Sequence, residues 1–367
     1  MSGENFNNPN VKLRALIAPL DWGLGHATRC IPIIKELIAN GLEVMIAASG
    51  VTETLLKKEF PNLKYLYLKG YNISYSRKKK WFFFRILAQL PKINNTIRYE
   101  HRWLKKQVSE HGIELVIADN RPGLYHDKIP SIYITHQLQI ISGNAFSEAI
   151  GRNIHYHYIN QFTACWVPDA EGNTNLAGLL SHPRVMPKIP VAYLGPLSRF
   201  EKKNGLSKKH DLLILLSGPE PQRTLLEEKI MDELKTYHGS VVLVRGLPNG
   251  KTVVTNDQKN IQQYNHLTAE QLNDLIQESH LVICRSGYTT IMDLAKLQQK
   301  AVLVPTPGQT EQEYLAEYLL EKKMFYSVQQ ENFLMEKITA AANDFPFTFP
   351  DVQEIYKTVI KKYLTSL

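Results

Sequence analysis

Short apolar runs alternate with helically spaced apolar residues along most of this chain, and the series occurs twice. The runs of the first half lie at 16–20, 44–48, 63–68, 114–118, 131–135 and 165–167, and those of the second half at 212–216, 241–244, 281–284 and 301–304. Runs this short and this apolar indicate buried strands, and the residues between them have helical spacing. Strands joined by helices pair in parallel through right-handed crossovers. The sequence therefore predicts an α/β protein of two doubly wound domains that face each other across a cleft.

A stretch rich in Pro, Gly and Lys at 190–211 separates the two series and is expected to be a linker. The 367 residues of the chain are enough for two domains with substantial cores. We place the N-terminal domain at 1–195 and the C-terminal domain at 196–345.

The charge and the cysteines restrict the partners and the compartment. Lys and Arg number 43 against 35 Asp and Glu, a formal net charge of +8 that favours anionic partners. Cys30, Cys165 and Cys284 form no C-x-x-C pair, so we expect reduced thiols. The polar start at 1–10 lacks the pattern of a secretory signal, and no apolar run approaches the roughly 20 residues of a membrane-spanning helix. We therefore expect a cytoplasmic protein.

Residues 75–106 concentrate the positive charge, with ten Lys or Arg and a single acidic residue, Glu100. The basic residues flank an aromatic cluster, which is typical of a segment that lies on an anionic bilayer, where each cation contributes about 1 kcal/mol. The predicted membrane-contact residues are Lys78, Lys79, Lys80, Trp81, Phe82, Phe83 and Phe84. Two alternatives remain: rings that fill the domain core, and RNA binding. The sequence has no RNP motif or GXXG clamp, so we expect no nucleic acid and a peripheral position at the inner face of the plasma membrane.

The stretch DWGLGHATR at 21–29 directly follows the first predicted strand and contains His26. Ligands of doubly wound sheets bind at the carboxyl ends of the strands, and histidine is the side chain most easily set to take a proton near neutral pH. A dinucleotide site is excluded, because Thr28 stands where the third glycine is needed and Ala-Ala-Ser at 47–49 replaces the acidic residue. We therefore predict that His26, on this loop, is a general base.

Asp119 ends another predicted strand and is expected to orient the imidazole of His26. The alternatives are a His26 that packs between loops or binds phosphate without moving a proton, and an Asp119 that caps a helix. His136 also follows a strand and could reach the cleft, but a lone histidine there more often satisfies local hydrogen bonds.

The most specific pattern of the second half is CRSGYTT at 284–290. A strand ends here and a helix begins near Thr289, and the N–H groups and dipole of a helix start attract anions. Ser286 can add a hydroxyl donor, and a second polar loop at 305–312 follows the next strand. Two adjacent polar loops favour a diphosphate site over the alternative of a Ser286 that only caps the helix.

This stretch resembles the nucleotide-sugar half of GT-B glycosyltransferases, in particular of glycosyltransferase family 28, in its CRSG sequence, the Thr and acidic residue that follow, the VP pair and the Gln-containing loop. The resemblance covers residues 210–320. It implies the GT-B fold, in which two Rossmann-like domains face each other, with a C-terminal helix at 351–367 that packs back on the first domain. It also implies inverting transfer of a sugar from a UDP-sugar donor to a hydroxyl acceptor, lipid-linked or membrane-borne.

The resemblance further implies which residues bind the donor. The diphosphate falls on Ser286, Gly287, Thr289 and Thr290, the ribose on Asp293 where the family has Glu, and the sugar hydroxyls on Glu311 and Gln312. The turn at 216–224 keeps the family's Gly218 and Arg223, the uracil lies near His266 and Leu267, and Gly25 joins them from the first loop. The leaving UDP would be stabilised by helix N-termini and by the cation of Arg223 or Arg285.

The chain has no D-x-D and no Cys/His cluster at ligand spacing, so we expect no metal, and no cofactor besides the UDP-sugar co-substrate. Two other functions stay open. The stretch GLGHATRC at 23–30 is also similar to part of a UDP-sugar hydrolase of pseudaminic acid biosynthesis, in which the histidine would activate water. A nucleotide-sugar sensor or an RNA-binding module would have the donor loops without a working base.

Overall fold

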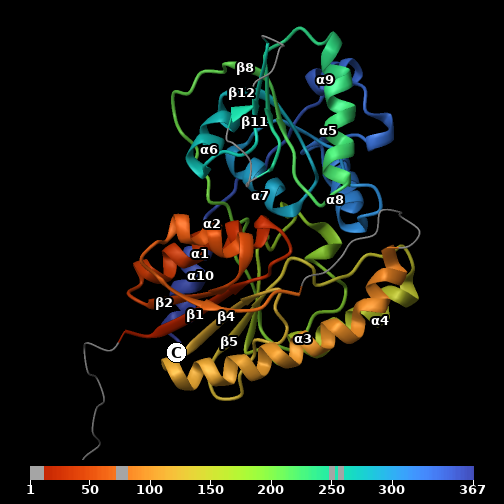
Figure 1. The fold of residues 1–367 in the computed structure, drawn as a ribbon. Coiled ribbons are helices and arrows are strands. Elements are labelled where there is room, and N and C mark those ends of the chain that lie inside the picture. The colour runs from red at the N-terminus through yellow and green to blue at the C-terminus, as the bar shows by residue number, and fades with distance from the viewer. Residues whose placement is uncertain (1–11, 72–81, 248–252, 255–259) are drawn as a thin grey trace, which may run out of the picture.

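Two seven-stranded sheets, one in each half of the chain, form the framework of the protein (Figure 1). The computed structural model describes residues 12–71, 82–247, 253–254 and 260–367, with the backbone alone for 82–90 and 253–254. Every strand pair is parallel except the pair of β10 with β11. The prediction of two doubly wound α/β domains is therefore confirmed.

The first sheet has the strand order β3-β2-β1-β4-β5-β6-β7. Its strands are β1 (Arg14–Pro19), β2 (Glu43–Ala48), β3 (Lys64–Tyr67), β4 (Leu115–Asp119), β5 (Ser131–Ile134), β6 (Ala164–Val167) and β7 (Val191–Tyr193). The order changes direction between β1 and β4. The loops that follow these two strands therefore diverge and leave a crevice at the carboxyl edge of the sheet.

The second sheet repeats this plan with the order β10-β11-β9-β8-β12-β13-β14. Its strands are β8 (His210–Leu215), β9 (Val241–Val244), β10 (Val253–Val254), β11 (Ile261–Tyr264), β12 (Ser279–Cys284), β13 (Ala301–Leu303) and β14 (Tyr326–Ser327). Its change of direction lies between β8 and β12, so its crevice is at the carboxyl ends of those two strands.

Helices cover both faces of the first sheet (Figure 1). One face packs against α1 (Leu24–Ala39), α2 (Gly50–Glu59) and α10 (Ile355–Leu364), and the other against α3 (Phe82–His111) and α4 (Ala145–Ile159). Because neighbouring residues of a strand point to opposite faces, Ile17 of β1 joins the first apolar cluster and Leu16 joins the second. Burial on both faces explains why these strands are continuous apolar runs in the sequence.

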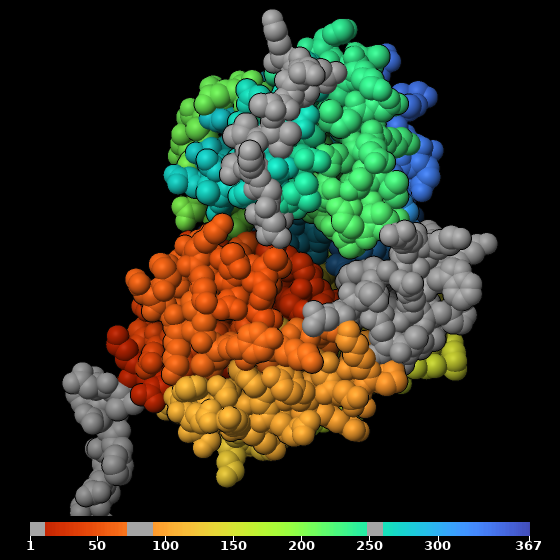
Figure 2. Space-filling view, viewed as in Figure 1, coloured from red at the N-terminus to blue at the C-terminus, as the bar shows by residue number. Residues whose placement is uncertain are grey.

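Among the described residues, the α-helices between β8 and α10 are α5 (Gln222–Glu233), α6 (Ala269–Gln277), α7 (Tyr288–Leu297), α8 (Thr310–Glu321) and α9 (Met335–Asp344). Short 3-10 helices in the described part of the chain are η2 (Gly178–Leu180), η3 (Leu234–Thr236) and η4 (Gln330–Asn332). Helix α7 packs against α1, so the apolar cluster of α1 continues into the second half. Figure 2 shows that the surface is hollowed where the two halves meet. One apolar cluster therefore contains residues of both halves.

The C-terminal helix α10 returns to the first half, where the chain ends beside β1 in Figure 1. Tyr356 and Ile360 of α10 are buried in the cluster that contains α1. The ring of Tyr363 meets Trp166 of β6 edge-on, with 5.6 Å between the ring centroids. The last helix thus ties the end of the chain to the first sheet.

The boundaries of two predicted segments were wrong. The structure starts α1 at Leu24, so His26 lies in the first turn of a helix and not on a loop. Gly23, with a φ of +91°, ends the turn between β1 and the helix at a backbone conformation that favours glycine. The predicted linker at 190–211 contains β7 and the start of β8, so only the part between these strands connects the sheets.

All three cysteines are unpaired and buried. Within the described ranges, we find no helix with the length and apolar character needed to cross a bilayer.

We expect Ile360→Ala in α10 to lower the free energy of unfolding by about 2–4 kcal/mol, because it empties a fully buried site between α10 and α1. Ile355→Ala in the same helix is the matched control, since Ile355 is 39% exposed and its truncation should cost less than about 1 kcal/mol. Urea unfolding of the two variants measures the difference. Equal losses would mean that α10 does not dock on the first half.

Candidate active site between the two sheets

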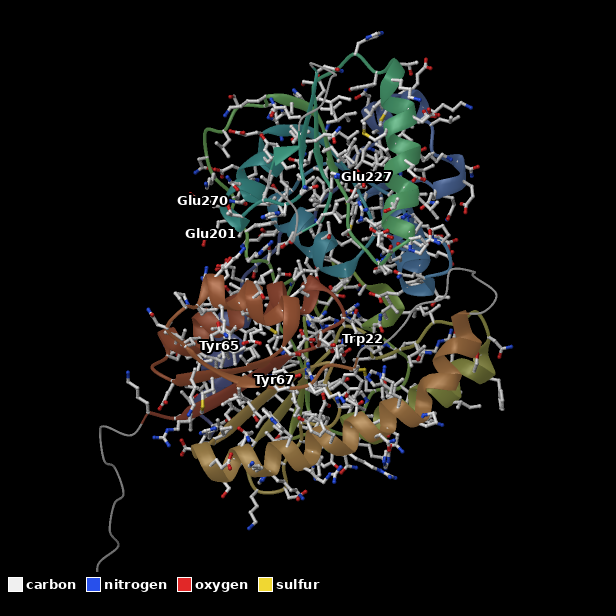
Figure 3. All side chains as sticks on the ribbon, viewed as in Figure 1. Trp22, Tyr65, Tyr67, Glu201, Glu227 and Glu270 are labelled. Atoms are coloured by element: carbon white, nitrogen blue, oxygen red, sulfur yellow. The ribbon has the colours of Figure 1, made fainter. Side chains whose placement is uncertain are left out.

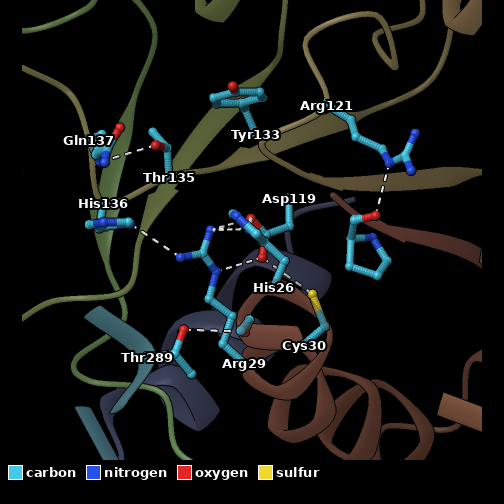
Figure 4. A network of polar contacts seen from close by, with 12 residues as sticks. His26, Arg29, Cys30, Asp119, Arg121, Tyr133, Thr135, His136, Gln137 and Thr289 are labelled. Carbon is cyan, nitrogen blue, oxygen red and sulfur yellow. Dashed lines mark hydrogen bonds and ion pairs between the residues drawn. The ribbon is translucent and has the colours of Figure 1, made fainter. Parts of the chain in front are cut away.

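The first part of the site is the contact between His26 and Asp119 at the carboxyl edge of the first sheet (Figure 4). Asp119 is the last residue of β4, and its partner in β1 is Pro19, after which the chain turns into α1. The first turn of α1 therefore carries His26 over the end of β4. His26 Nδ1 lies 2.9 Å from Asp119 Oδ1. The two residues that were predicted to act together are thus in hydrogen-bond contact.

Arg29, one turn further along α1, completes this group. Its Nε donates to Asp119 Oδ2 at 2.6 Å, and its Nη2 donates to Asp119 Oδ1. Both side chains are buried, Arg29 to 2% exposure and Asp119 completely. Burial alone would raise the pKa of Asp119, but Arg29 and then His26 outweigh burial and hold that pKa well below its usual range. Asp119 is therefore an anion at neutral pH and fixes the positions of both partners.

The tautomer of His26 decides whether it can act as a base. Nδ1 is also 2.9 Å from Arg29 Nη2, so it either donates to Asp119 or accepts from Arg29. When Nδ1 carries the proton and donates to Asp119, Nε2 holds a lone pair, and Nε2 has no hydrogen-bond partner among the described residues. Burial lowers the pKa of His26, while Asp119 opposes this shift. The ring is therefore neutral near pH 7, as a general base must be.

His136 brings the second half of the chain into the same group. It follows β5, and its Nδ1 lies 3.2 Å from Arg29 Nη1. Its Nε2 lies 2.8 Å from Glu311 Oε1, in the first turn of α8. The ring stacks on Tyr288 of α7, with 4.2 Å between centroids and an angle of 8° between planes. The expectation that His136 satisfies local hydrogen bonds is wrong, because its partners come from both halves.

Neither Arg29 nor the bridging role of His136 was predicted from the sequence. Arg29 stands three residues after His26, which places both on one face of a helix. This spacing is visible in the sequence. It indicates that the two side chains lie together only if residues 24–29 are predicted to be helical, and they were predicted to be a loop. No comparable signal exists for His136, whose partner Glu311 lies 175 residues away in the sequence.

The start of α7 faces the first turn of α1. Thr289 Oγ1 donates to the carbonyl oxygen of Gly25 at 3.3 Å. A Cβ on Gly25 would stand 2.8 Å from that same Oγ1, so this approach requires glycine. A Cβ on Gly287, the N-cap of α7, would meet no heavy atom within 4 Å. The helix start is therefore close to His26 and has open space in front of it.

Ser286 does not cap α7, and its hydroxyl has a partner within the protein. It is fully buried, and its Oγ donates to the backbone carbonyl of Gln312 at 2.8 Å. The side chain of Gln312 in turn accepts from Thr306 N at 2.9 Å and donates to Gln309. These bonds join the two polar loops, as their order in the sequence suggested. The hydroxyl of Ser286 and the side chain of Gln312 thus have partners within the protein, and their contacts with a donor stay predictions.

The two arginines expected to face the leaving group have structural partners instead. Arg285 is 1% exposed and donates to the backbone carbonyls of Val304, Pro305 and Gln222. Burial lowers its pKa to about 10. Arg223 pairs with Glu220 and with Glu227, which lies along α5 in Figure 3. Arg223 is thus paired with two carboxylates, and Arg285 is fixed by backbone carbonyls. A contact of either guanidinium with the leaving group stays a prediction.

The remaining predicted donor residues lie around the carboxyl edge of the second sheet. Thr290 is in the first turn of α7, exposed Gly218 follows β8 with a φ of +103°, and His266 and Leu267 lie between β11 and α6. Asp293 accepts a hydrogen bond from Ser198 of the connection between the sheets. Burial raises the pKa of Asp293 to about 6. A contact of Asp293 with ribose stays a prediction.

The predicted membrane-contact residues fall mostly outside the part of the chain that the structure describes. Lys78, Lys79, Lys80 and Trp81 lie outside the described residues, and Phe82, Phe83 and Phe84 begin α3 with side chains that are not described. Among the described residues, no group of three or more His, Cys, Asp or Glu side chains could hold a metal ion.

Comparison with known proteins finds a family match within the second half and a relative that aligns over most of the chain. Residues 223–347 match the glycosyltransferase family 28 C-terminal domain. A UDP-N-acetylglucosamine--N-acetylmuramyl-(pentapeptide) pyrophosphoryl-undecaprenol N-acetylglucosamine transferase of Clostridium tetani (strain Massachusetts / E88) is 22% identical over 329 residues, which cover 86% of this chain and 84% of that protein. The protein of the same name from Histophilus somni (strain 129Pt) is 34% identical over 135 residues, 35% of this chain and 38% of its own.

Solved structures share the whole fold. The glycotransferase of kitacinnamycin superposes with a TM-score of 0.64 at 13% identity, covering 97% of this chain and 95% of its own. Acinetobacter baumannii MurG superposes with a TM-score of 0.54 at 13% identity, and the superposition covers 97% of this chain and 100% of that protein. The prediction of the GT-B fold is therefore confirmed.

We expect Asp119→Asn to lower the free energy of unfolding by about 3–5 kcal/mol at pH 7, because it leaves Arg29 buried without an anion. A carboxyl whose pKa is depressed by folding contributes stability above its unfolded pKa of about 3.9 and loses that contribution as pH falls through the folded value. The difference between wild type and variant should therefore narrow below about pH 4.

Denaturant unfolding at several pH values measures this. Asp127→Asn is the matched control, because Asp127 forms an exposed pair with Lys105 and its loss should change stability little. A gap between wild type and Asp119→Asn that stays constant down to pH 2 would contradict the assignment of Asp119 as a buried anion.

Proposed function

We propose that this protein, which has the GT-B fold and whose residues 223–347 match the glycosyltransferase family 28 C-terminal domain, moves a sugar from a UDP-sugar to a hydroxyl group of a lipid-linked acceptor. We assign acceptor binding to the N-terminal domain, residues 1–195, and donor binding to the C-terminal domain, residues 196–345. The relatives from Clostridium tetani and Histophilus somni carry the name of a transferase with this kind of donor and acceptor.

One observation carries the proposal: the start of α7 contacts the residue next to His26, through the hydrogen bond from Thr289 to Gly25. A diphosphate held by the N–H groups of α7 would then lie beside the imidazole that is expected to act as base. Two helices, α1 and α7, begin at this point, and each contributes partial positive charge. Charge that develops on the leaving diphosphate would be stabilised without a metal ion.

In the proposed reaction, Nε2 of His26 takes the proton of the acceptor hydroxyl as its oxygen attacks the anomeric carbon. The bond between that carbon and the phosphate oxygen breaks, and UDP leaves from the opposite face, so the configuration is inverted. Asp119 accepts the Nδ1 proton of His26 in a hydrogen bond and stabilises the imidazolium that forms. Main-chain N–H groups of α7 and the hydroxyl of Thr290 would bind the diphosphate, since the hydroxyls of Ser286 and Thr289 have partners within the protein.

A lipid-linked acceptor also fits the predicted membrane contact of residues 78–84. Helix α4 carries a second group of exposed apolar side chains. Phe146, Ile150 and Ile154 are 76%, 46% and 52% exposed and recur every four residues, which places them on one face of the helix. We therefore propose a peripheral position on the cytoplasmic face of an anionic membrane.

The function is tested by incubating the protein with a panel of UDP-sugars, with and without membrane lipid extract. We expect UDP release from one of these sugars that depends on lipid and is unchanged by EDTA. His26→Ala should bind UDP as wild type does and turn over about 10²–10⁴ times more slowly. His238→Ala, an exposed histidine beyond α5, is the control and should keep full activity.

Other outcomes would change the assignment. Equal UDP release without lipid would indicate a hydrolase, in which His26 activates water. UDP binding without turnover, indifferent to His26→Ala, would indicate a nucleotide-sugar sensor. Loss of activity with EDTA would contradict metal independence.

Membrane contact is tested by sedimentation with vesicles of phosphatidylglycerol and of phosphatidylcholine. We expect binding to the anionic vesicles, lost when Trp81, Phe82, Phe83 and Phe84 are all changed to Ser and weakened by Phe146→Ser, because each ring removed costs apolar contact with the bilayer. Tyr67→Ser is the control, since this tyrosine is 70% exposed on β3 and lies away from α4 (Figure 3). Unchanged binding of the fourfold variant together with a lowered melting temperature would assign the rings to the core.

A further inference from the structure

His136 is held in place by residues of both halves of the protein. Its ring lies flat against Tyr288, the first residue of α7, and only 5% of the residue is exposed. Tyr288 is itself fixed, because its hydroxyl donates to the backbone carbonyl of Pro168 at 2.8 Å. His136 therefore occupies a set position between β5 and α7, unlike a histidine on a surface loop.

The direction of both hydrogen bonds of the His136 ring follows from the chemistry of its partners. A guanidinium has only donors, so Nδ1, at 3.2 Å from Arg29 Nη1, must accept and carries no proton. The ring then has its proton on Nε2, which donates to Glu311 Oε1 at 2.8 Å. Hydrogen bonds thus run from Arg29 through His136 to Glu311, and Arg29 is held at its other side by Asp119.

Glu311 reaches the gap between the halves with its carboxylate. Its side chain is 34% exposed, and Oε2 has no hydrogen-bond partner among the described residues. Burial would raise the pKa of Glu311, but His136, and after it His26 and Arg29, more than compensate and lower it. The carboxylate is therefore charged, has one oxygen fixed by His136, and presents the other as an acceptor.

We propose that His136 is a positioning residue of the transfer reaction, which fixes the carboxylate of Glu311 relative to the group of His26, Arg29 and Asp119. The inference rests on the proposed function, in which Glu311 accepts hydrogen bonds from hydroxyls of the donor sugar. His136 does not touch the reacting atoms. It sets the distance between the residue that holds the sugar and the residue that activates the acceptor.

Three substitutions distinguish a role of His136 in positioning Glu311 from a role in packing against Tyr288. His136→Phe keeps a flat ring against Tyr288 but removes both ring nitrogens. His136→Gln supplies a carbonyl oxygen for Arg29 and an N–H group for Glu311, so it is the conservative variant. Glu311→Gln removes the negative charge that accepts the hydrogen bond from His136 Nε2. Each is assayed for kcat, for KM of the UDP-sugar, and for the Kd of UDP alone.

We expect His136→Phe to raise the KM of the UDP-sugar about tenfold or more, as the loss of a hydrogen bond to a charged group does, and to leave the Kd of UDP within about twofold. His136→Gln should recover most of this loss. The double variant His136→Phe/Glu311→Gln should be no worse than Glu311→Gln alone, because both changes remove the same contact.

The positioning role would be overturned by a His136→Phe enzyme with unchanged KM, by a His136→Gln enzyme as impaired as His136→Phe, or by additive losses in the double variant. An equal rise in the Kd of UDP would also overturn it, by indicating general damage to the interface. A wild-type protein that turns over no UDP-sugar would instead overturn the proposed function itself, and the positioning role with it.

Discussion

The buried ion pair between Asp119 and Arg29 is the interaction on which the rest of the site depends. A carboxylate at the end of a central strand, removed from water, is tolerated only when a cation neutralises it and hydrogen bonds satisfy its oxygens. Arg29 does both with two N–H groups, and it can do so only because α1 begins at Leu24, directly over the end of β4. The position of His26 is a consequence, since one helical turn separates it from Arg29 and the same carboxylate holds its Nδ1.

The close approach of α1 and α7 follows from the same arrangement. With α1 fixed over β4, its first turn faces the first turn of α7, and the absence of a Cβ at Gly25 lets Thr289 reach the backbone. Any larger residue at this position would bring its Cβ to 2.8 Å from Thr289 Oγ1, so the contact depends on the glycine. The apolar cluster that continues from α1 through α7 keeps this geometry across the two sheets.

The strands were predictable because burial on both faces leaves a continuous apolar run, and the pairing of His26 with Asp119 was predictable because both follow strands of one parallel sheet. Four strands were missed. β7 was hidden in a Pro- and Lys-rich stretch, β10 and β14 have two residues each, and β11 reads Ile-Gln-Gln-Tyr. The roles of Arg29, His136, Arg223 and Arg285 depend on partners, and no local pattern shows whether a charge meets a carboxylate, a carbonyl or a ligand. This is why the start of α7 could be predicted from the sequence, whereas the partners of these charged side chains could not.

The use of these arginines constrains the chemistry that the site can perform. Arg29 is neutralised by Asp119, Arg223 by two glutamates, and Arg285 holds backbone carbonyls, so in the proposed reaction the charge of the diphosphate would be met chiefly by N–H groups at helix starts. Such groups are fixed dipoles and need no side-chain movement as the charge develops. After the proton transfer, His26 would carry a positive charge that Asp119 favours and burial and Arg29 disfavour. A proton held in this balance is easily released, which prepares the same ring for the next turnover.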